Sequence, residues 1–215
     1  MRNGKLMVAP TVLWLSFFFV VPLLIVVAVS FASRTPYGQV IFDWTLGNYA
    51  RFTETLYLSI FLDTLIVALI TTVLTILLGY PLAYFIAQLP QKWQQPGLIL
   101  VMIPFWINFL IRSYAWVIIL RTQGVLNTIL LKFGLIEQPL QMLYNEVAVM
   151  LGMVYALLPF MVLPIYVSIE QLDHRLLEAA SDLGASPFTA FRKITLPLTM
   201  PGIAAGTILV FISSL

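Results

Sequence analysis

The chain has 215 residues, of which 61% are hydrophobic and only 9% are charged, with a formal net charge of +2 at pH 7. Ordinary globular domains are about 25% charged. The mean hydropathy of +1.00 therefore excludes an ordinary soluble fold and indicates a protein that is partly covered by lipid. The absence of cysteine and the single histidine, His174, exclude a disulfide framework, a thiol nucleophile and a multi-histidine metal centre. The small, scattered charge also argues against nucleic-acid binding.

Four long apolar stretches and the beginning of a fifth follow one another along the chain. They are residues 8–31, 64–87, 98–120, 147–168 and 203–215. A bilayer core of about 30 Å needs about 20 helical residues, so each of the first four is long enough to span it. The first exceeds the apolar core of a signal peptide, about 7–15 residues, and is interpreted as an uncleaved anchor. The fifth would reach only about 20 Å. We therefore expect that helix to be cut short and the chain to be a fragment of a longer protein.

The predicted orientation has a cytoplasmic N-terminus, because Arg2 and Lys5 precede the first span with no acidic residue between them. Alternation of the spans then places residues 32–63 and 121–146 outside the cell. It places residues 88–97 and 169–202 inside. Six lysines and arginines lie in the inside segments and four in the outside segments, a bias in the expected direction.

One outside segment has a helical pattern of its own. Residues 125–131, followed by Gly134, are typical of a short amphipathic helix that lies along the membrane face.

The last inside segment, residues 169–202, gathers acids, bases and prolines in a chain that is otherwise poor in charge. Residues 176–183 are rich in helix formers and end at Gly184, the residue preferred for a left-handed helix stop. Ser186 and Pro187 are typical of a helix start, an N-cap followed by a first-turn proline.

A second helix is expected over residues 188–194. Its apolar residues Phe188, Phe191 and Ile194 are expected near one face that points outward. Pro197 and Pro201 would then set the beginning of the fifth span. The pattern predicts a helix–turn–helix elbow that stands in the cytoplasm.

This elbow resembles the signature loop of ABC importer permeases, the EAA loop. The pattern is Glu-Ala-Ala, three residues, Gly, nine residues and Ile-x-Leu-Pro. The chain matches it at Glu178, Ala179, Ala180, Gly184, Ile194, Leu196 and Pro197. The resemblance implies that the segment docks in a groove of an ATPase subunit. The two alanines would allow close approach, the glycine would make the turn, and the glutamate would pair with a base on the partner.

The same resemblance implies an all-α integral membrane protein. Its fold would be the transmembrane domain of a type I ABC importer, with about six helices when complete and four and a partial fifth here. We expect one permease domain over residues 1–215, truncated at its C-terminus, with residues 169–202 as its ATPase-coupling loop.

Other stretches are similar to the spermidine/putrescine permeases, and in particular to the first of the two paired subunits. They are residues 78–83, 104–116, 124–127, 155–166 and 196–202. The resemblance runs from about residue 48 to the end. It implies ATP-driven import of a polyamine across the bacterial inner membrane. Related importers of amino acids, sulfate, metals or thiamine share the coupling loop, so these solutes remain alternatives.

The partners implied are an ABC ATPase dimer, a second and different permease, a soluble substrate-binding protein and membrane lipid. The chain lacks the phosphate-binding pattern Gly-x-x-x-x-Gly-Lys-Ser/Thr. We therefore expect a transport subunit and not an enzyme, with no cofactor of its own and with ATP and Mg on the partner ATPase. An ion-driven secondary transporter or a membrane scaffold would not need the elbow.

A polyamine path should alternate carboxylates and aromatic faces, because the substrate alternates ammonium groups and methylenes. The candidates are Asp63, Glu137 and Glu146 at the outer ends of spans, with Trp106, Tyr155 and Tyr166 deeper. For Asp63 an N-cap of the second span is the preferred interpretation.

Two residues within the spans are interpreted structurally. Arg112, which interrupts the third span, is expected to be held by an ion pair or by backbone carbonyls. Gly79 is expected to let a neighbouring helix approach closely.

Overall fold

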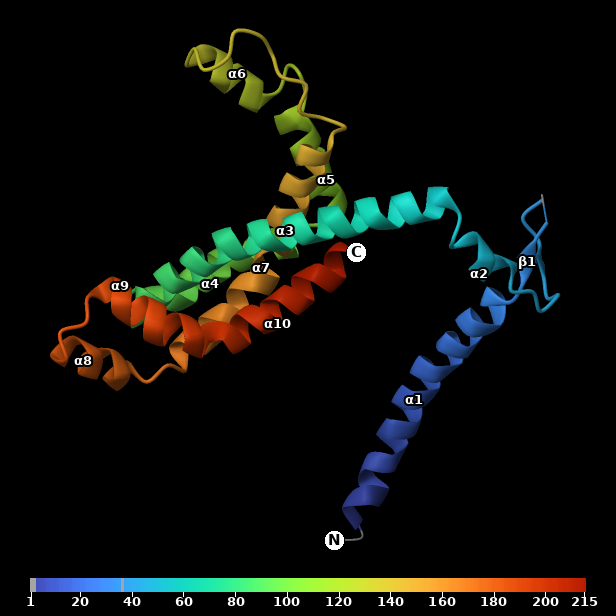
Figure 1. Ribbon diagram of the computed structural model, residues 1–215, viewed down its shortest axis with the longest axis horizontal. Coiled ribbons are helices and arrows are strands. Elements are labelled where there is room, and N and C mark those ends of the chain that lie inside the picture. Colours follow the sequence, from blue (N-terminus) through green and yellow to red (C-terminus); the bar gives the residue numbers. More distant parts are fainter. Residues whose placement is uncertain (1–2, 36) are drawn as a thin grey trace. The chain divides into compact units, whose positions relative to one another are not determined.

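The computed structural model describes residues 3–35 and 37–215 and is mainly helical (Figure 1). The chain divides into two compact units, residues 1–62 and 63–215. The division falls within one helix, α3 (Thr55–Gln88), and each unit is described by itself. That the units act as one permease domain stays a prediction.

The first unit contains helix α1 (Asn3–Ser30), strands β1 (Ser33–Arg34) and β2 (Val40–Ile41), and helix α2 (Gly47–Arg51). The strands pair antiparallel, with Ser33 opposite Ile41. Asn48 closes the C-terminal end of α1, because its Nδ2 donates to the carbonyls of Ser30 and Ala32 at 3.0 and 2.7 Å. The Ser30 carbonyl, at the end of α1, has no partner within the helix, so the side chain satisfies it and also holds the residue that follows the helix.

The second unit follows α3 with a series of shorter and longer helices. They are α4 (Gln91–Trp106), α5 (Phe109–Leu120), α6 (Val125–Lys132), α7 (Glu146–Glu170), α8 (His174–Asp182), α9 (Pro187–Ala190), the π-helical turn η1 (Phe191–Thr195) and α10 (Leu196–Ser214). Helix α6 confirms the short helix predicted at 125–131, and Gly134 after it has a φ of +66°.

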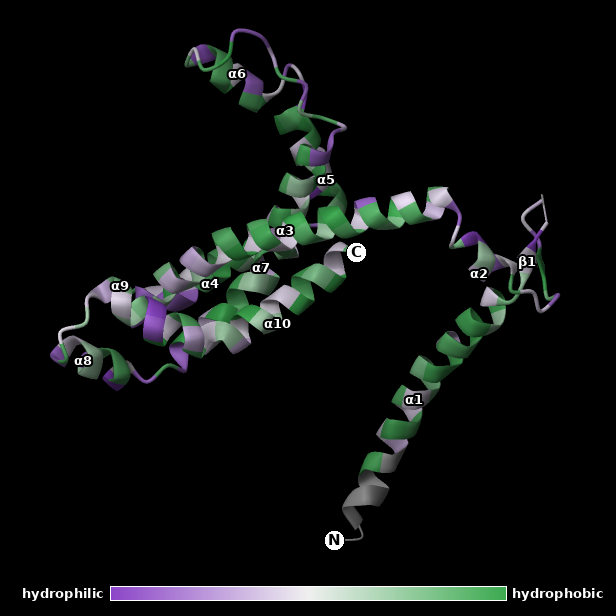
Figure 2. Ribbon diagram, in the orientation of Figure 1, coloured by the Kyte–Doolittle hydropathy of each residue, from purple (hydrophilic) through white to green (hydrophobic). Residues whose placement is uncertain are grey.

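Within the described residues, five helical segments are long and apolar enough to cross a membrane. They are Pro10–Ser30, Thr55–Gln88, Phe109–Lys132, Glu146–Glu170 and Pro187–Ser214. Figure 2 shows apolar residues along α3, α7 and α10 and a gathering of polar residues around α8 and α9. The expectation of several membrane-spanning helices is therefore confirmed, although the bounds of the spans differ from the prediction.

The third predicted span, residues 98–120, is not one continuous helix. Helix α4 ends at Trp106, Ile107 has an extended backbone with ψ of 133°, and α5 begins at Phe109. Asn108 caps α5, because its side-chain oxygen accepts a hydrogen bond from the Leu110 N–H at 2.9 Å. Asparagine is among the strongest N-caps, and this local signal overrides the continuous hydropathy of the stretch.

Arg112 bridges this break. Its Nη1 donates to the carbonyl oxygen of Pro104 at 3.1 Å, and its guanidinium carbon lies 5.8 Å from the ring centroid of Phe109. The last carbonyls of α4 have no partner within their helix, so the arginine satisfies one of them. The expectation of a backbone carbonyl as partner is confirmed.

The fifth span begins earlier than predicted. Helix α10 has 19 residues from Leu196 and continues a helical run that starts at Pro187. Nineteen residues rise about 28 Å, so the expectation of a helix that reaches only about 20 Å was wrong. Pro197 lies in the first turn of α10 but inside this continuous run, so its missing N–H leaves one helical hydrogen bond unmade.

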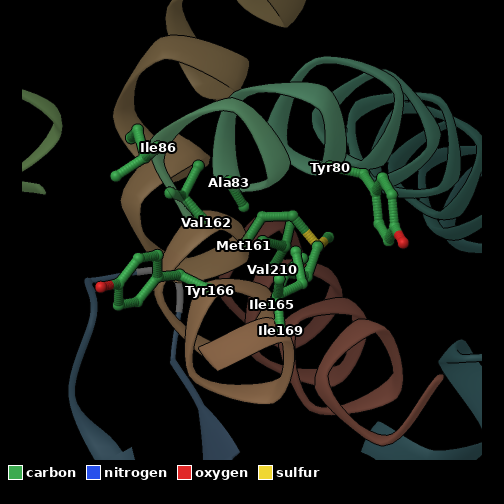
Figure 3. Close-up of a cluster of buried hydrophobic side chains, with 9 residues drawn as sticks. All are labelled: Tyr80, Ala83, Ile86, Met161, Val162, Ile165, Tyr166, Ile169 and Val210. Carbon is green, nitrogen blue, oxygen red and sulfur yellow. The ribbon is translucent and has the colours of Figure 1, made fainter. Parts of the chain in front are cut away.

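The core of the second unit forms where α3, α7 and α10 meet. Its buried members are Tyr80, Ala83, Ile86, Met161, Val162, Ile165, Tyr166, Ile169 and Val210 (Figure 3). Met161 has glycines on two sides. A Cβ at Gly79 of α3 would lie 2.9 Å from the Met161 Cγ, and one at Gly206 of α10 would lie 2.8 Å from its Sδ. The predicted close approach at Gly79 is confirmed.

Buried threonines accompany this core, and the hydroxyls of Thr72 and Thr75 form hydrogen bonds within their own helix, α3. Thr72 Oγ1 donates to the Ala68 carbonyl at 2.7 Å, and Thr75 Oγ1 donates to the Thr71 carbonyl at 2.6 Å. Such bonds allow polar side chains to be buried without a partner on another helix.

Candidate coupling loop and transport-path residues

The first helix of the predicted coupling loop is α8. Asp173 caps its start by accepting a hydrogen bond from the Arg175 N–H at 3.0 Å. At its end the N–H of Gly184 donates to the Ser181 carbonyl and that of Ala185 to the Ala180 carbonyl, both at 2.9 Å. Gly184 has a φ of +78°. This left-handed glycine stop is the one that the sequence predicts.

The predicted start of the second helix is also confirmed. Ser186 Oγ accepts a hydrogen bond from the Thr189 N–H at 3.3 Å, and Pro187 occupies the first turn of α9. Proline suits this position because its N–H would have no helical acceptor there and its φ already matches the helix.

The second helix does not end at residue 194 as predicted. Helix α9 passes through η1 directly into α10, so the second arm of the elbow and the fifth span form one helical run. At the end of η1 the N–H of Leu196 donates to the Phe191 carbonyl, five residues back. A proline in a regular helix clashes with the carbonyl four residues before it. The wider π turn just before Pro197 offers a way to relieve that clash.

The seven motif residues fall into two groups. Glu178, Ala179 and Gly184 are exposed and Ala180 is half-buried, all on α8 or at its stop. At the other end of the loop Ile194 and Leu196 are half-buried, and Leu196 packs against the buried core, while Pro197 is exposed. The first group is mostly exposed, and the second lies where the loop joins the helices.

The prediction that the second helix points its apolar face outward is partly wrong. Phe188 is 71% exposed, but Phe191 and Ile194 are half-buried. Residues three apart in a helix turn by about 60° relative to each other, so Phe188 and Ile194 point in clearly different directions. Leu183, which is 88% exposed, accompanies Phe188 at the surface of the loop instead.

The residues proposed for the transport path do not form a single site in the described part of the chain. Glu146 is the exposed first residue of α7, and Tyr166 lies near the other end of the same helix. Twenty residues of helix separate them, which is about 30 Å. Tyr166 is only 6% exposed, and its hydroxyl donates to Gln94 Oε1 of α4 at 3.3 Å.

The remaining candidates lie elsewhere. Asp63 is exposed and lies inside α3, which begins at Thr55, so the N-cap interpretation was wrong. Trp106 is the exposed last residue of α4, and Glu137 is exposed in the segment after α6. Tyr155 is half-buried in α7.

Sequence reasoning missed the aromatic partner of Tyr155. The Trp116 ring of α5 lies edge-on to it, with 5.4 Å between ring centroids. Both residues line a cavity of about 380 Å³ together with Arg112. Tyr155 also lines a larger, apolar cavity of about 730 Å³ between α3, α4 and α7. The aromatic character of residue 116 was the available signal, but its pairing depends on how two helices pack.

Comparison with known proteins assigns the family. The spermidine/putrescine transport system permease protein PotB of Haemophilus influenzae is 44% identical over 211 residues, which cover 98% of the chain and 74% of the relative. The chain belongs to this family of ABC importer permeases. The protein of the same name from Escherichia coli is 46% identical over 209 residues, covering 97% of the permease and 76% of the relative. No model of a known protein family matches the chain.

The fold of the permease is also found in a solved structure. The crystal structure of a bacterial alginate ABC transporter in complex with a periplasmic protein has a TM-score of 0.69 and 20% sequence identity, and covers 97% of the permease and 71% of that chain. The permease therefore has the all-α transmembrane fold of a type I ABC importer. It is a multi-pass inner-membrane protein and a transport subunit rather than an enzyme.

Proposed function

We propose that the permease moves a polyamine such as spermidine or putrescine into the cytoplasm, driven by ATP hydrolysis on a separate subunit. The observation that carries this proposal is identity of 44% and 46% to permeases named for spermidine and putrescine transport, over nearly the whole chain. Permeases for amino acids, sulfate, metals or thiamine remain the alternatives if the substrate differs.

The coupling loop, residues 169–202, is proposed to dock on the ATPase. Exposed motif residues of α8, Glu178 and Ala179, support this role, and so do the exposed apolar side chains Leu183 and Phe188. Exposed large apolar groups next to charged ones are typical of a surface that a partner covers. The partner ATPase, as a dimer, would hold ATP and Mg, and the permease itself would hold no cofactor.

This role implies an orientation. The loop must face the cytoplasm to reach an ATPase. Because the predicted spans alternate in direction, the N-terminus with Arg2 and Lys5 would then also lie in the cytoplasm. The further proposed partners are a second permease, which would complete the path, and a soluble binding protein on the outer side. The six candidate path residues would then act in a path that both permeases line.

The proposal is tested with the complete transport complex reconstituted into lipid vesicles. Radiolabelled spermidine should accumulate only when ATP is supplied on the side of the ATPase and the loaded binding protein on the other. Unlabelled putrescine should compete, whereas sulfate and amino acids should not. ATP-driven accumulation of sulfate without accumulation of spermidine would contradict the substrate, and accumulation driven by an ion gradient without ATP would contradict the mechanism.

A further inference from the structure

The π turn η1 lies between α9 and α10, so a movement of α8 and α9 reaches α10 through it. The N–H of Leu196, directly after the turn, donates to the carbonyl of Phe191, five residues back. Such a turn interrupts the regular hydrogen-bond ladder, and π turns often occur at functional sites. Without support from other helices, a turn of this kind would bend and absorb the movement.

The first residue of η1 is held by two tyrosines of α3. The Phe191 ring lies edge-on to the ring of Tyr80, with 5.9 Å between centroids, and edge-on to the ring of Tyr84, with 5.5 Å. The two tyrosines lie one turn apart and their rings stack at 6.5 Å. Edge-to-face pairs at these separations are favourable beyond the apolar area that they bury.

The helix beyond η1 is held by one of the same tyrosines. The hydroxyl of Tyr80 forms a hydrogen bond of 3.1 Å with Thr199 Oγ1, and both groups are buried. Figure 3 shows the Tyr80 side chain leaving α3 apart from the other side chains of the core. Tyr80 therefore contacts the helical run at the first residue of the π turn, Phe191, and beyond the end of the turn, at Thr199.

We infer that Tyr80, Tyr84, Phe191 and Thr199 form a clamp that passes the movement of the coupling loop to α3. This inference rests on the proposed ATP-driven function. The clamp ties the first residue of η1, and α10 just beyond the turn, to the same helix, so a displacement of α8 and α9 shifts α3 together with α10 instead of bending the π turn. Phe191 and Tyr80 are positioning residues in this scheme, because they do not touch the substrate and affect the transport path only by moving α3.

The test measures how many polyamine molecules enter per ATP hydrolysed by the reconstituted complete complex. Phe191→Ala should lower this ratio about three- to tenfold, which lies within the roughly two- to thirtyfold range expected for residues that carry coupling between sites. Phe191→Tyr keeps a ring at this position and should largely restore the ratio. The matched control is Phe85→Ala, because Phe85 follows Tyr84 in α3 but is 61% exposed. The control should leave the ratio unchanged.

A second variant addresses the case in which Phe191→Ala does not assemble. Tyr80→Phe removes only the hydroxyl, and Thr199 Oγ1 still donates to the carbonyls of Thr195 or Leu196, so no group loses all its partners. We expect a smaller fall in the ratio, about twofold, with normal assembly. Phe188→Ala should instead weaken docking on the ATPase and lower uptake and ATP hydrolysis together.

The outcomes separate the clamp from the function on which it rests. If the unmodified complex shows no ATP-driven polyamine uptake, the proposed function fails. If that complex is active and Tyr80→Phe, together with any Phe191→Ala complex that assembles, keeps the unmodified ratio, the clamp is overturned. A reduced ratio at normal assembly supports it, because a purely structural role would change the amount of complex and not its efficiency.

Discussion

Gly79 of α3 faces Met161 of α7 so closely that a Cβ on the glycine would lie 2.9 Å from the methionine Cγ. Met161 is fully buried, and Gly206 limits it on another side. Gly79→Val should therefore overpack this contact and destabilise the permease by about 1–3 kcal/mol. The measurement is thermal unfolding of the purified complex in detergent.

A matched substitution separates overpacking from helix propensity. Gly152 lies in α7, and nothing lies within 4 Å of the position that a Cβ would take there, so Gly152→Ala should be neutral or stabilise by about 0.5–1 kcal/mol. If Gly79→Ala and Gly152→Ala shift the unfolding temperature equally, the close contact at Gly79 makes no contribution to the free energy of unfolding.

The second prediction concerns Gly184, where a side chain would be disfavoured by the backbone conformation and not by contact with neighbouring atoms. Its φ is +78°, yet nothing lies within 4 Å of a Cβ there. Gly184→Val should cost about 1–2 kcal/mol in the turn, because a branched side chain disfavours the left-handed region. We expect strong loss of ATP-driven uptake with normal membrane insertion. Gly184→Asn should retain more activity, since asparagine tolerates this conformation. Full uptake by Gly184→Val would count against the elbow as the coupling device.

The proposed orientation can be tested because the chain has no cysteine. Ser186→Cys should react with a thiol reagent only when the reagent enters the cytoplasm, and Gln39→Cys should react from outside. Neither position is buried, so access to them depends on the side of the membrane. Labelling of residue 186 in intact cells by an impermeant reagent would reverse the orientation.

Substitution of Glu137 and Glu146 tests whether carboxylates at the outer opening of the proposed transport path attract a cationic substrate. Neither is buried, and each lies beside the outer end of a helix in the proposed topology. Glu137→Gln with Glu146→Gln should raise the apparent KM for spermidine at low salt, because fewer carboxylates attract the cation. The basal ATPase rate should stay the same, since the proposed topology places the coupling loop on the opposite side of the membrane. Glu146 also lies in the first turn of α7, where a negative charge favours the helix.

The control for this pair is a measurement of helix stability. The loss of one exposed first-turn charge costs about 0.3–1 kcal/mol at low salt, which thermal unfolding detects. Unchanged kinetics in a folded double variant would show that these acids take no part in uptake.

Local signals explain which parts of the structure could be predicted. The stop at Gly184 and the cap at Ser186 are determined by a few neighbouring residues, and both were predicted correctly. The break at Asn108 was also locally encoded, but the apolar run around it hid the cap. At Pro197 the prolines suggested a helix start, whereas a π turn lets the helix continue through them.

Tertiary contacts explain most of what could not be predicted. The side of the helix that Phe191 occupies depends on Tyr80 and Tyr84, more than 100 residues away in sequence. The pairing of Tyr155 with Trp116 likewise depends on the packing of α7 against α5. Periodicity within one helix contains no information about which neighbour a side chain meets.

The threonines of α3 have a mechanical consequence. Thr72 and Thr75 are buried beside the core, but their hydroxyls donate to carbonyls of their own helix. Because these bonds travel with α3, a small axial shear of the helix breaks none of them. Sliding of packed helices is one of the ways in which proteins change state. The hydroxyls of Thr72 and Thr75 therefore add no hydrogen bond to another helix that would resist such sliding, whereas the bond between Tyr80 and Thr199 crosses from α3 to α10 and favours movement of these two helices together.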